Sequence, residues 1–317
     1  MTSQRVSRLV EMVQQLRSGA VERPAVRRLI GVLAVAIFAG FLYAARGSIP
    51  TWNEVEWPYL ATSAFIVSPV MVLWMGAQYR LSGKLTGHTI HVGEASRIAI
   101  LSGAANLLPI PGSVIIRAEA LRSKGVTFKR SALASALVGV AWLGSSGVLA
   151  GILILSENLV VGVVALVLGL AGLGMYAAGV RSLVPPEEVR NLVVLGALQG
   201  AGMALTAGLN LFVVTRGLRF DASVASTFLV STSGVISAAI GIFPGGLGLR
   251  EAMAAGLSGF TGLTAAEGTL AATTVHLTIV VVLLLAAIAI SVRPARDTRS
   301  NRGPSDADRS QPESPKS

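Results

Sequence analysis

The sequence contains no cysteine, which excludes disulfide bonds, thiolate nucleophiles and cysteine-based metal sites. Charge is also scarce, because Asp, Glu, Lys and Arg together make up only 13% of the 317 residues, about half the fraction that is usual in soluble globular proteins. Hydrophobic residues, by contrast, make up 52%. A chain of this composition has lipid as the solvent of most of its length, so it is expected to be an all-α integral membrane protein.

Motifs for cofactors and metals are missing as well. His88 and His91 share one loop without a third ligand, so no metal site is predicted. A Gly-x-x-x-x-Gly-Lys-Ser/Thr sequence is absent, and no cofactor is expected. The formal net charge is +10, but the basic residues lie at the edges of apolar runs rather than on a soluble domain. Anionic membrane lipids are therefore expected as partners and nucleic acid is not.

Six apolar runs are long enough to cross the roughly 30 Å of bilayer hydrocarbon as helices, which takes about 20 residues. They span 29–45, 59–79, 131–155, 159–180, 192–214 and 264–292. Residues 1–28 form a basic leader, and the polar, Ser- and Pro-rich residues 293–317 are expected to be a disordered tail. The membrane domain is therefore predicted to cover 29–292.

Two further apolar stretches, 95–120 and 222–256, are interrupted near the middle by proline and glycine. Proline removes a backbone donor and glycine loosens the helix, so each stretch is expected to break into two half-helices that form a re-entrant hairpin. The residues predicted to break the backbone are Pro109, Pro111 and Gly112 in the first stretch, and Pro244, Gly245, Gly246 and Gly248 in the second.

The distribution of basic residues indicates the orientation. With both hairpins returning to the side from which they came, all but four of the 26 Lys and Arg residues fall on the cytoplasmic side. The exceptions are Arg46, Arg216, Arg219 and Arg250. By the positive-inside rule, the chain is predicted to be a multi-pass protein of the plasma (cytoplasmic) membrane with both termini in the cytoplasm.

The order of elements in residues 59–155 recurs in residues 191–292, at an offset of 133 to 137 residues. In each half a Pro-Gly pair precedes an arginine, which is Arg117 in the first half and Arg250 in the second. Because an odd number of crossings separates the halves, they are expected to form an inverted-topology repeat, an arrangement that places a polar site near the midplane in transporters. The alternative is that Gly- and Ala-rich helices resemble one another by composition.

Ionisable groups inside a membrane cost roughly 2.5 to 3.5 kcal/mol each and need a partner or a purpose. The arginines are expected to bind an anionic phosphate, with the acids setting the charge balance. The residues predicted to contact a lipid headgroup are Arg117, Glu119, Arg250, Glu251 and Asn106. Alternatively, each arginine ends its hairpin at the headgroup boundary, and the asparagine caps a half-helix.

Three other polar residues lie within the predicted membrane helices. His276, about a third of the way along the last run, is favoured as a hydrogen-bonded packing residue over a proton relay. Gln199 and Asn210 are expected to bridge neighbouring helices.

Two motifs carry a resemblance. The Asn-Leu-Leu-Pro-x-Pro-Gly run at 106–112 and the Phe-Pro-Gly-Gly-Leu-Gly-Leu-Arg-Glu run at 243–251 resemble the lysylphosphatidylglycerol synthase transmembrane-region family. The similarity covers about residues 25–292. In that family this flippase-like domain is associated with moving aminoacylated phospholipid between leaflets, so the resemblance implies transport of a phospholipid or another anionic lipid. The soluble aminoacyl-transferring domain is not expected here, and neither is synthase activity.

Two other functions are open. The chain could be an accessory membrane subunit that anchors a lipid-modifying or glycosyl-transferring enzyme in trans. It could also be a rhomboid-like serine protease, because Gly144-Ser-Ser-Gly147 fits the Gly-x-Ser-Gly pattern and His276 could act as base. The glycines expected after a rhomboid histidine are missing from 277–285, so no catalytic residue is predicted and the chain is not expected to be an enzyme. Whether it forms a homo-oligomer is left open.

Overall fold

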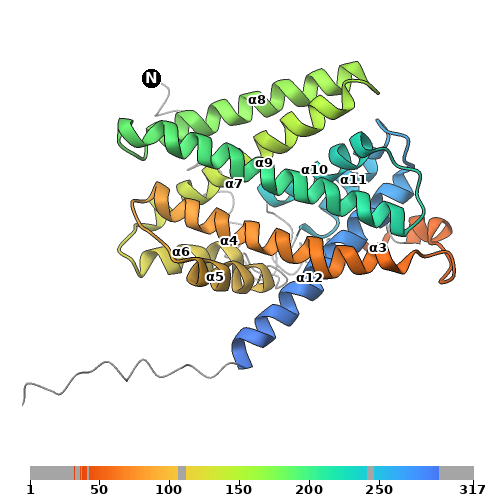
Figure 1. Cartoon of the computed structure of the whole chain (residues 1–317), viewed down its shortest axis with the longest axis horizontal. Coiled ribbons are helices and arrows are strands. Elements are labelled where there is room, and N and C mark those ends of the chain that lie inside the picture. The colour runs from red at the N-terminus through yellow and green to blue at the C-terminus, as the bar shows by residue number, and fades with distance from the viewer. Residues whose placement is uncertain are drawn as a thin grey trace, which may run out of the picture.

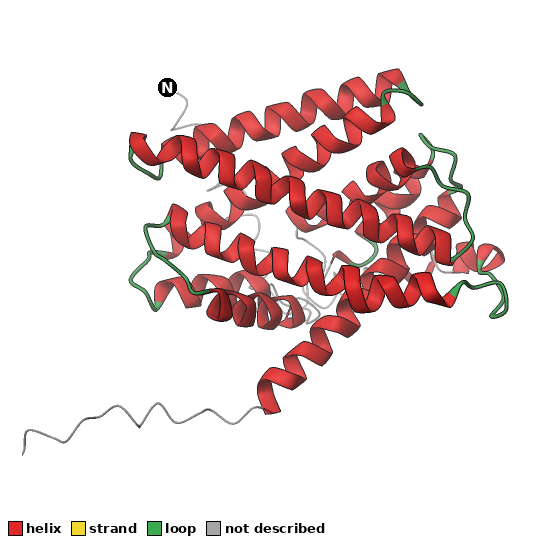
Figure 2. Cartoon of the chain, viewed as in Figure 1, coloured by secondary structure: helices red, strands yellow, loops and turns green. Residues whose placement is uncertain are grey.

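The computed structural model describes residues 43–105, 112–240 and 246–292, together with 32, 36 and 38–40. These residues form helices joined by turns, and the described part contains no β-strand (Figure 2). The prediction of an all-helical chain is therefore confirmed. The predicted leader at 1–28 and the predicted tail at 293–317 lie outside the described residues, as does most of the first apolar run.

The helices follow one another in a simple order along the chain (Figure 1). A short 3-10 turn, η1 (Arg46–Ser48), precedes a long helix made of α3 (Trp57–Thr62), the π-helical turn η2 (Ser63–Val67) and α4 (Ser68–Leu85). The remaining helices are α5 (Val92–Ala105), α6 (Gly112–Arg122), α7 (Phe128–Ile154), α8 (Leu159–Arg181), α9 (Pro186–Gly217), α10 (Val224–Ile240), α11 (Leu249–Ser258) and α12 (Ala265–Val292).

Five helical segments of the described chain are long and apolar enough to cross a membrane. They are Trp57–Leu85, Phe128–Ile154, Leu159–Arg181, Pro186–Gly217 and Ala265–Ile290. These are the last five of the six runs that the sequence predicted. Most extend beyond the predicted runs because the helix continues through polar residues at its ends, as a membrane helix does when it enters the headgroup region.

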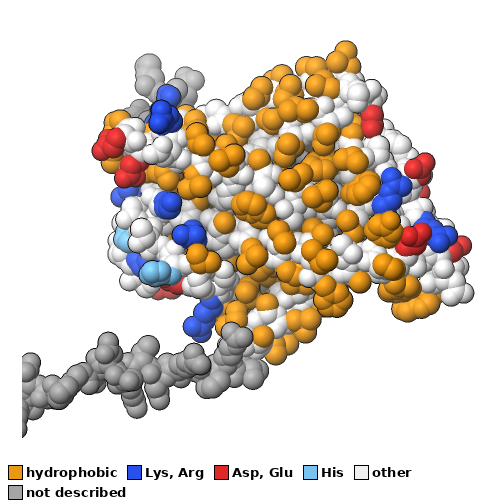
Figure 3. Space-filling model, viewed as in Figure 1, with side chains coloured by type: hydrophobic (Ala, Val, Ile, Leu, Met, Phe, Trp, Pro, Cys, Tyr) orange, Lys and Arg blue, Asp and Glu red, His pale blue; other side chains and the backbone are white. Residues whose placement is uncertain are grey.

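The surface has the layout of a helical membrane protein. In Figure 3 hydrophobic side chains cover the middle of the visible face, and charged side chains gather at its two opposite ends. One end holds the turns α4–α5, α6–α7 and α8–α9, and the other holds the turns α7–α8 and α9–α10 (Figure 1). The first end carries Lys84, Arg122, Lys124, Lys129, Arg130, Arg181 and Arg190, and the second carries Glu54, Glu56, Glu157, Arg216, Arg219 and Asp221.

The broken stretches appear as two pairs of short helices. The helix α5 contacts α6, and α10 contacts α11. In addition, α5 packs against α4 and α12, whereas α10 packs against α9 and α7. The pair α5 and α6 lies in the left half of Figure 1, and the pair α10 and α11 lies in the right half. Of the predicted breaking residues, Pro109, Pro111, Pro244 and Gly245 lie outside the described residues.

A polar network joins α9 to the π-helical turn. Ser63 Oγ donates to Asn210 Oδ1 at 2.6 Å, and Asn210 Nδ2 donates to Ser68 Oγ at 3.3 Å. The wider π turn places the two serines, five residues apart, on nearly the same face, which an α-helix would not do. The prediction that Asn210 bridges helices is confirmed.

Glycines set the spacing between α7 and α8. A Cβ added at Gly169 would collide with the backbone nitrogen of Val148, and one added at Gly151 would lie 2.6 Å from that of Leu166. Such close backbone approach is the packing that small residues allow between membrane helices. Gly144 and Gly147 of the Gly-Ser-Ser-Gly tetrad belong to the same interface, so their presence needs no catalytic explanation.

This interface gives a stability prediction. Gly169→Ala should lower the free energy of unfolding by about 1–3 kcal/mol, because the methyl group forces α7 and α8 apart. Gly174→Ala, on the same helix with nothing within 4 Å of the added Cβ, should be neutral or slightly stabilising, since alanine favours helix by up to about 1 kcal/mol. Denaturation in mixed detergent micelles measures both. Equal effects of the two substitutions would contradict the packing explanation.

Candidate functional site

The first candidate arginine, Arg117, lies on α6 and points toward α5. Its Nε donates a hydrogen bond of 3.2 Å to Ser102 Oγ on α5. Tyr79 of α4 lies near the guanidinium, and its hydroxyl is buried without a hydrogen-bond partner. A guanidinium that uses one of its five N–H donors on a serine keeps the others for a ligand. Neither Tyr79 nor Ser102 was predicted, because both are distant from Arg117 in the sequence.

Glu119 is not brought together with Arg117. Its side chain is 68% exposed and lies 3.7 Å from Arg122 Nη1, one turn further along α6. Two residues along an α-helix turn the side chain by about 200°, so Glu119 faces away from the side that Arg117 occupies. Glu94 of α5 is paired with a different basic residue, since its Oε1 lies 3.0 Å from Lys124 Nζ.

The second candidate arginine, Arg250, lies near the start of α11 and runs alongside α10. A Cβ added at Gly234 would come within 3.9 Å of Arg250 Nε, and this Nε is buried with no hydrogen-bond acceptor. The neighbouring Glu251 is fully buried. Its Oε2 accepts the backbone N–H of Gly248 at 2.7 Å, which caps α11.

The other oxygen of Glu251 faces a histidine. Oε1 has no hydrogen-bond partner, and it lies 3.9 Å from His276 Nδ1 on α12. Arg250, Glu251 and His276 therefore form one buried group of ionisable side chains. The sequence pointed to the arginine and the glutamate, but a packing role was favoured for the histidine. The available signal was that His276 is the single histidine within the predicted membrane helices.

The glycines of the second motif shape the start of α11. Gly246 and Gly248 have φ angles of 76° and 78°, in the left-handed region that disfavours other residues. A Cβ at Gly246 would also lie 2.9 Å from Ser237 Oγ on α10. Gly112, the last residue of the first motif, begins α6. Asn106 lies outside the described residues.

Several buried polar atoms of the described helices have no hydrogen-bond partner, although such atoms are usually satisfied in folded proteins. They belong to Tyr79, Ser131, Trp142, Gln199, Arg250, Glu251 and Thr273. Both amide atoms of Gln199 are among them, so the predicted helix-bridging hydrogen bond of this residue is not formed within the described structure. Unpaired donors and acceptors of this kind suit an interior that receives water or a polar ligand.

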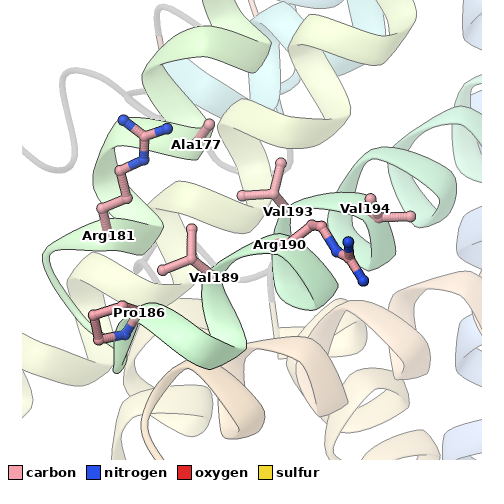
Figure 4. Close-up of a pocket in the computed structure, with 7 residues that line it drawn as sticks. All are labelled: Ala177, Arg181, Pro186, Val189, Arg190, Val193 and Val194. Atoms are coloured by element: carbon pink, nitrogen blue, oxygen red, sulfur yellow. The ribbon is translucent and has the colours of Figure 1, made fainter.

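Two surface depressions lie apart from both arginines. A groove of about 570 Å³ lies between α8 and α9 and is lined by Ala177, Arg181, Pro186, Val189, Arg190, Val193 and Val194 (Figure 4). The second, of about 330 Å³, is lined by Glu56, Tyr59, Arg216, Arg219, Phe220 and Asp221. The first groove combines apolar side chains with two guanidinium groups, which suits contact with surrounding lipid.

The remaining predictions concern catalysis and metals. Within the described helices no hydrogen bond or ion pair joins Ser146 to His276, and the neighbouring Ser145 donates to the Ala197 carbonyl at 3.2 Å. No group of three or more acidic or histidine side chains that could hold a metal comes together in the part of the chain that the structure describes. Two separate groups of candidate side chains therefore remain. One is Arg117 on α6 with Ser102, and the other is Arg250 and Glu251 on α11 with His276 on α12.

No protein-family model matches the chain, and no curated protein matches it either.

Proposed function

We propose that this chain is a flippase-like transporter that moves a phospholipid or another anionic lipid, with aminoacylated phospholipid included, between the leaflets of the membrane. The observation that carries the proposal is a pair of arginines, Arg117 and Arg250, each placed after a helix break within a bundle of apolar helices. Guanidinium groups bind phosphate through several charge-assisted hydrogen bonds. The resemblance of the two sequence motifs to the lysylphosphatidylglycerol synthase transmembrane-region family agrees with this.

The contacts between helices support an inverted repeat of the halves 59–155 and 191–292. In each half the first arm of the hairpin packs on the preceding helix of its own half and on the last helix of the other half: α5 on α4 and α12, and α10 on α9 and α7. The two hairpins also lie toward opposite ends of the molecule (Figure 1). Under this arrangement the first hairpin enters from the cytoplasm and the second from the exterior, and both termini are cytoplasmic in the plasma membrane.

The two arginines would act in sequence. Each hairpin would present its arginine to a headgroup that enters from its own side of the membrane. A phosphate released by Arg117 can then bind Arg250 while the acyl chains stay in the lipid. Unpaired polar atoms of Tyr79, Gln199 and Thr273 would replace part of the water that the headgroup loses. Alternation of the two halves around this path is the motion expected of inverted repeats.

Purified protein in liposomes tests the proposal. Fluorescent phosphatidylglycerol should cross faster than in protein-free liposomes, and Arg117→Gln should slow the crossing roughly 10- to 100-fold, because a hydrogen bond to a charged group contributes about 1.5–3 kcal/mol. Arg122→Gln is the matched control, since Arg122 lies on the same helix with a 71% exposed side chain. Its rate should equal that of the unaltered protein.

Two outcomes would overturn the proposal. If the unaltered protein gives no faster crossing than protein-free liposomes, transport by this chain alone is wrong, and the accessory-subunit alternative takes its place. If both substitutions slow crossing equally, the effect belongs to surface charge rather than to a headgroup site.

A further inference from the structure

We infer that Glu251 and His276 form a proton-binding site that couples lipid movement to a proton gradient. This inference rests on the proposed function. The sequence contains no Gly-x-x-x-x-Gly-Lys-Ser/Thr motif for ATP, and a proton gradient would supply the energy for lipid transport instead. It starts from the position of the pair. His276 lies 11 residues into the span that begins at Ala265, which is roughly 16 Å of helix, or about half the hydrocarbon thickness.

The geometry of the pair is suited to holding a proton. Glu251 is fully buried, and His276 is 7% exposed. The carboxylate has one oxygen committed to the Gly248 N–H and one that is free and 3.9 Å from the imidazole Nδ1. A side-chain rotation that moves either atom by about 1 Å brings Glu251 Oε1 and His276 Nδ1 within hydrogen-bond distance. The free oxygen is thus the natural partner of an imidazolium.

Few other charges bear on the histidine. The helix α12 packs against α4, α5, α9, α10 and α11. Among the described residues of these helices, the charged groups that act on His276 are Arg250 and Glu251, both on α11. The protonation of this site is therefore decided within a group of three side chains.

Charge balance links the proton to the lipid. With His276 neutral, Arg250 and Glu251 cancel, and the buried group has no net charge. A phosphate monoanion on Arg250 leaves an excess negative charge, and a proton alone leaves an excess positive charge. Either excess is costly away from water. Proton and phosphate together restore neutrality, so each favours the binding of the other.

The proton step balances without any further reactant. On the side with more protons, an N–H bond forms at the imidazole lone pair while the phosphate binds Arg250, and the imidazolium pairs with Glu251 Oε1. On the other side the phosphate leaves with its lipid and the N–H bond releases its proton to water. One proton and one singly charged lipid move together, so the cycle transfers no net charge.

The test uses the full chain in phosphatidylcholine vesicles with trace fluorescent phosphatidylglycerol. A membrane-impermeant reductant reports the fraction of label in the outer leaflet, and a trapped dye reports internal pH. With the interior one pH unit more alkaline than the exterior, the inner-to-outer ratio of labelled lipid should rise about tenfold at steady state, because one proton accompanies each lipid. A potassium diffusion potential should leave that ratio unchanged. The direction of insertion does not matter, since the gradient sets the sign.

The variants separate coupling from folding. His276→Gln should let lipid equilibrate more slowly, because phosphate then binds Arg250 without a compensating proton, and should abolish both the tenfold accumulation and the accompanying internal acidification. Glu251→Gln should also abolish both, because Arg250 and the phosphate are then neutral without a proton, and its amide oxygen can still accept the Gly248 N–H. His91→Gln, in an exposed loop, should behave as the unaltered protein. If Glu251→Gln fails to fold, His276→Gln alone decides.

Each failure points to a different claim. If the unaltered protein moves no lipid under any condition, the proposed function fails. If it moves lipid but the pH difference leaves the leaflet ratio unchanged, or if His276→Gln still accumulates lipid, transport stands and the proton site is wrong.

Discussion

Replacing Glu251 by alanine should lower the free energy of unfolding by about 3–5 kcal/mol, the cost of removing one partner from a buried charge pair. The substitution leaves Arg250, whose Nε is buried, without the neighbouring negative charge and removes the acceptor for the Gly248 N–H. Glu251→Gln keeps that acceptor and should lose less. Unfolding in mixed detergent micelles, followed by circular dichroism, measures both.

Glu267 provides the matched control, because it caps α12 in the way that Glu251 caps α11. Its Oε2 accepts the backbone N–H of Thr264 at 2.8 Å, but at an exposed position and without a buried arginine beside it. Glu267→Ala should therefore cost only about 1 kcal/mol, the value of a cap alone. If Glu251→Ala costs no more than Glu267→Ala, the buried charge group contributes nothing beyond the cap.

The second large effect is an all-or-none labelling pattern. Because the chain has no native cysteine, a single introduced cysteine reports its own side of the membrane without any background. Ser123, in the α6–α7 turn, and Gly262, in the α11–α12 turn, are both exposed. A membrane-impermeant maleimide added to intact cells should label Gly262→Cys and leave Ser123→Cys unlabelled, because the proposed inverted repeat puts these turns on opposite sides.

Permeabilising the cells should then make Ser123→Cys fully reactive. This controls for a cysteine that stays unlabelled because the protein buries it rather than because it faces the cytoplasm. Labelling of both positions from the same side would show that the two hairpins enter from one face. The inverted arrangement would then be wrong, and the hand-over of a headgroup between Arg117 and Arg250 would lose its basis.

The sequence alone pointed to two neighbouring residues of the candidate site. Arg250 and Glu251 are adjacent in the sequence, so they were identified together without knowledge of the tertiary structure. The sequence predicted that the glycines break the helix, but the left-handed conformation of Gly246 and Gly248 came from the structure. Glu119 was expected near Arg117 because they are close in the sequence. The structure instead places them on different faces of α6. Which face of a short helix is buried depends on the helices that pack against it.

The neighbours of both arginines could not be predicted. Ser102 and Tyr79 reach Arg117 from α5 and α4, and His276 reaches Glu251 from α12. For Gln199 and Asn210 the sequence expected the same role, yet only Asn210 finds partners in the described structure. A π-helical turn brings Ser63 and Ser68 to Asn210, and no pattern of residues announced that turn.

Composition and the length of the apolar runs alone determined that this is a helical membrane protein, because a long apolar run can form all its backbone hydrogen bonds inside a bilayer only as a helix. The positions of proline and glycine predicted that 95–120 and 222–256 are each interrupted, since these residues act on their own segment, and the described parts of both stretches form pairs of short helices. Which buried charges meet was decided only by the tertiary structure. Such contacts join helices far apart in the sequence, and their partners follow from how the helices pack rather than from any local pattern.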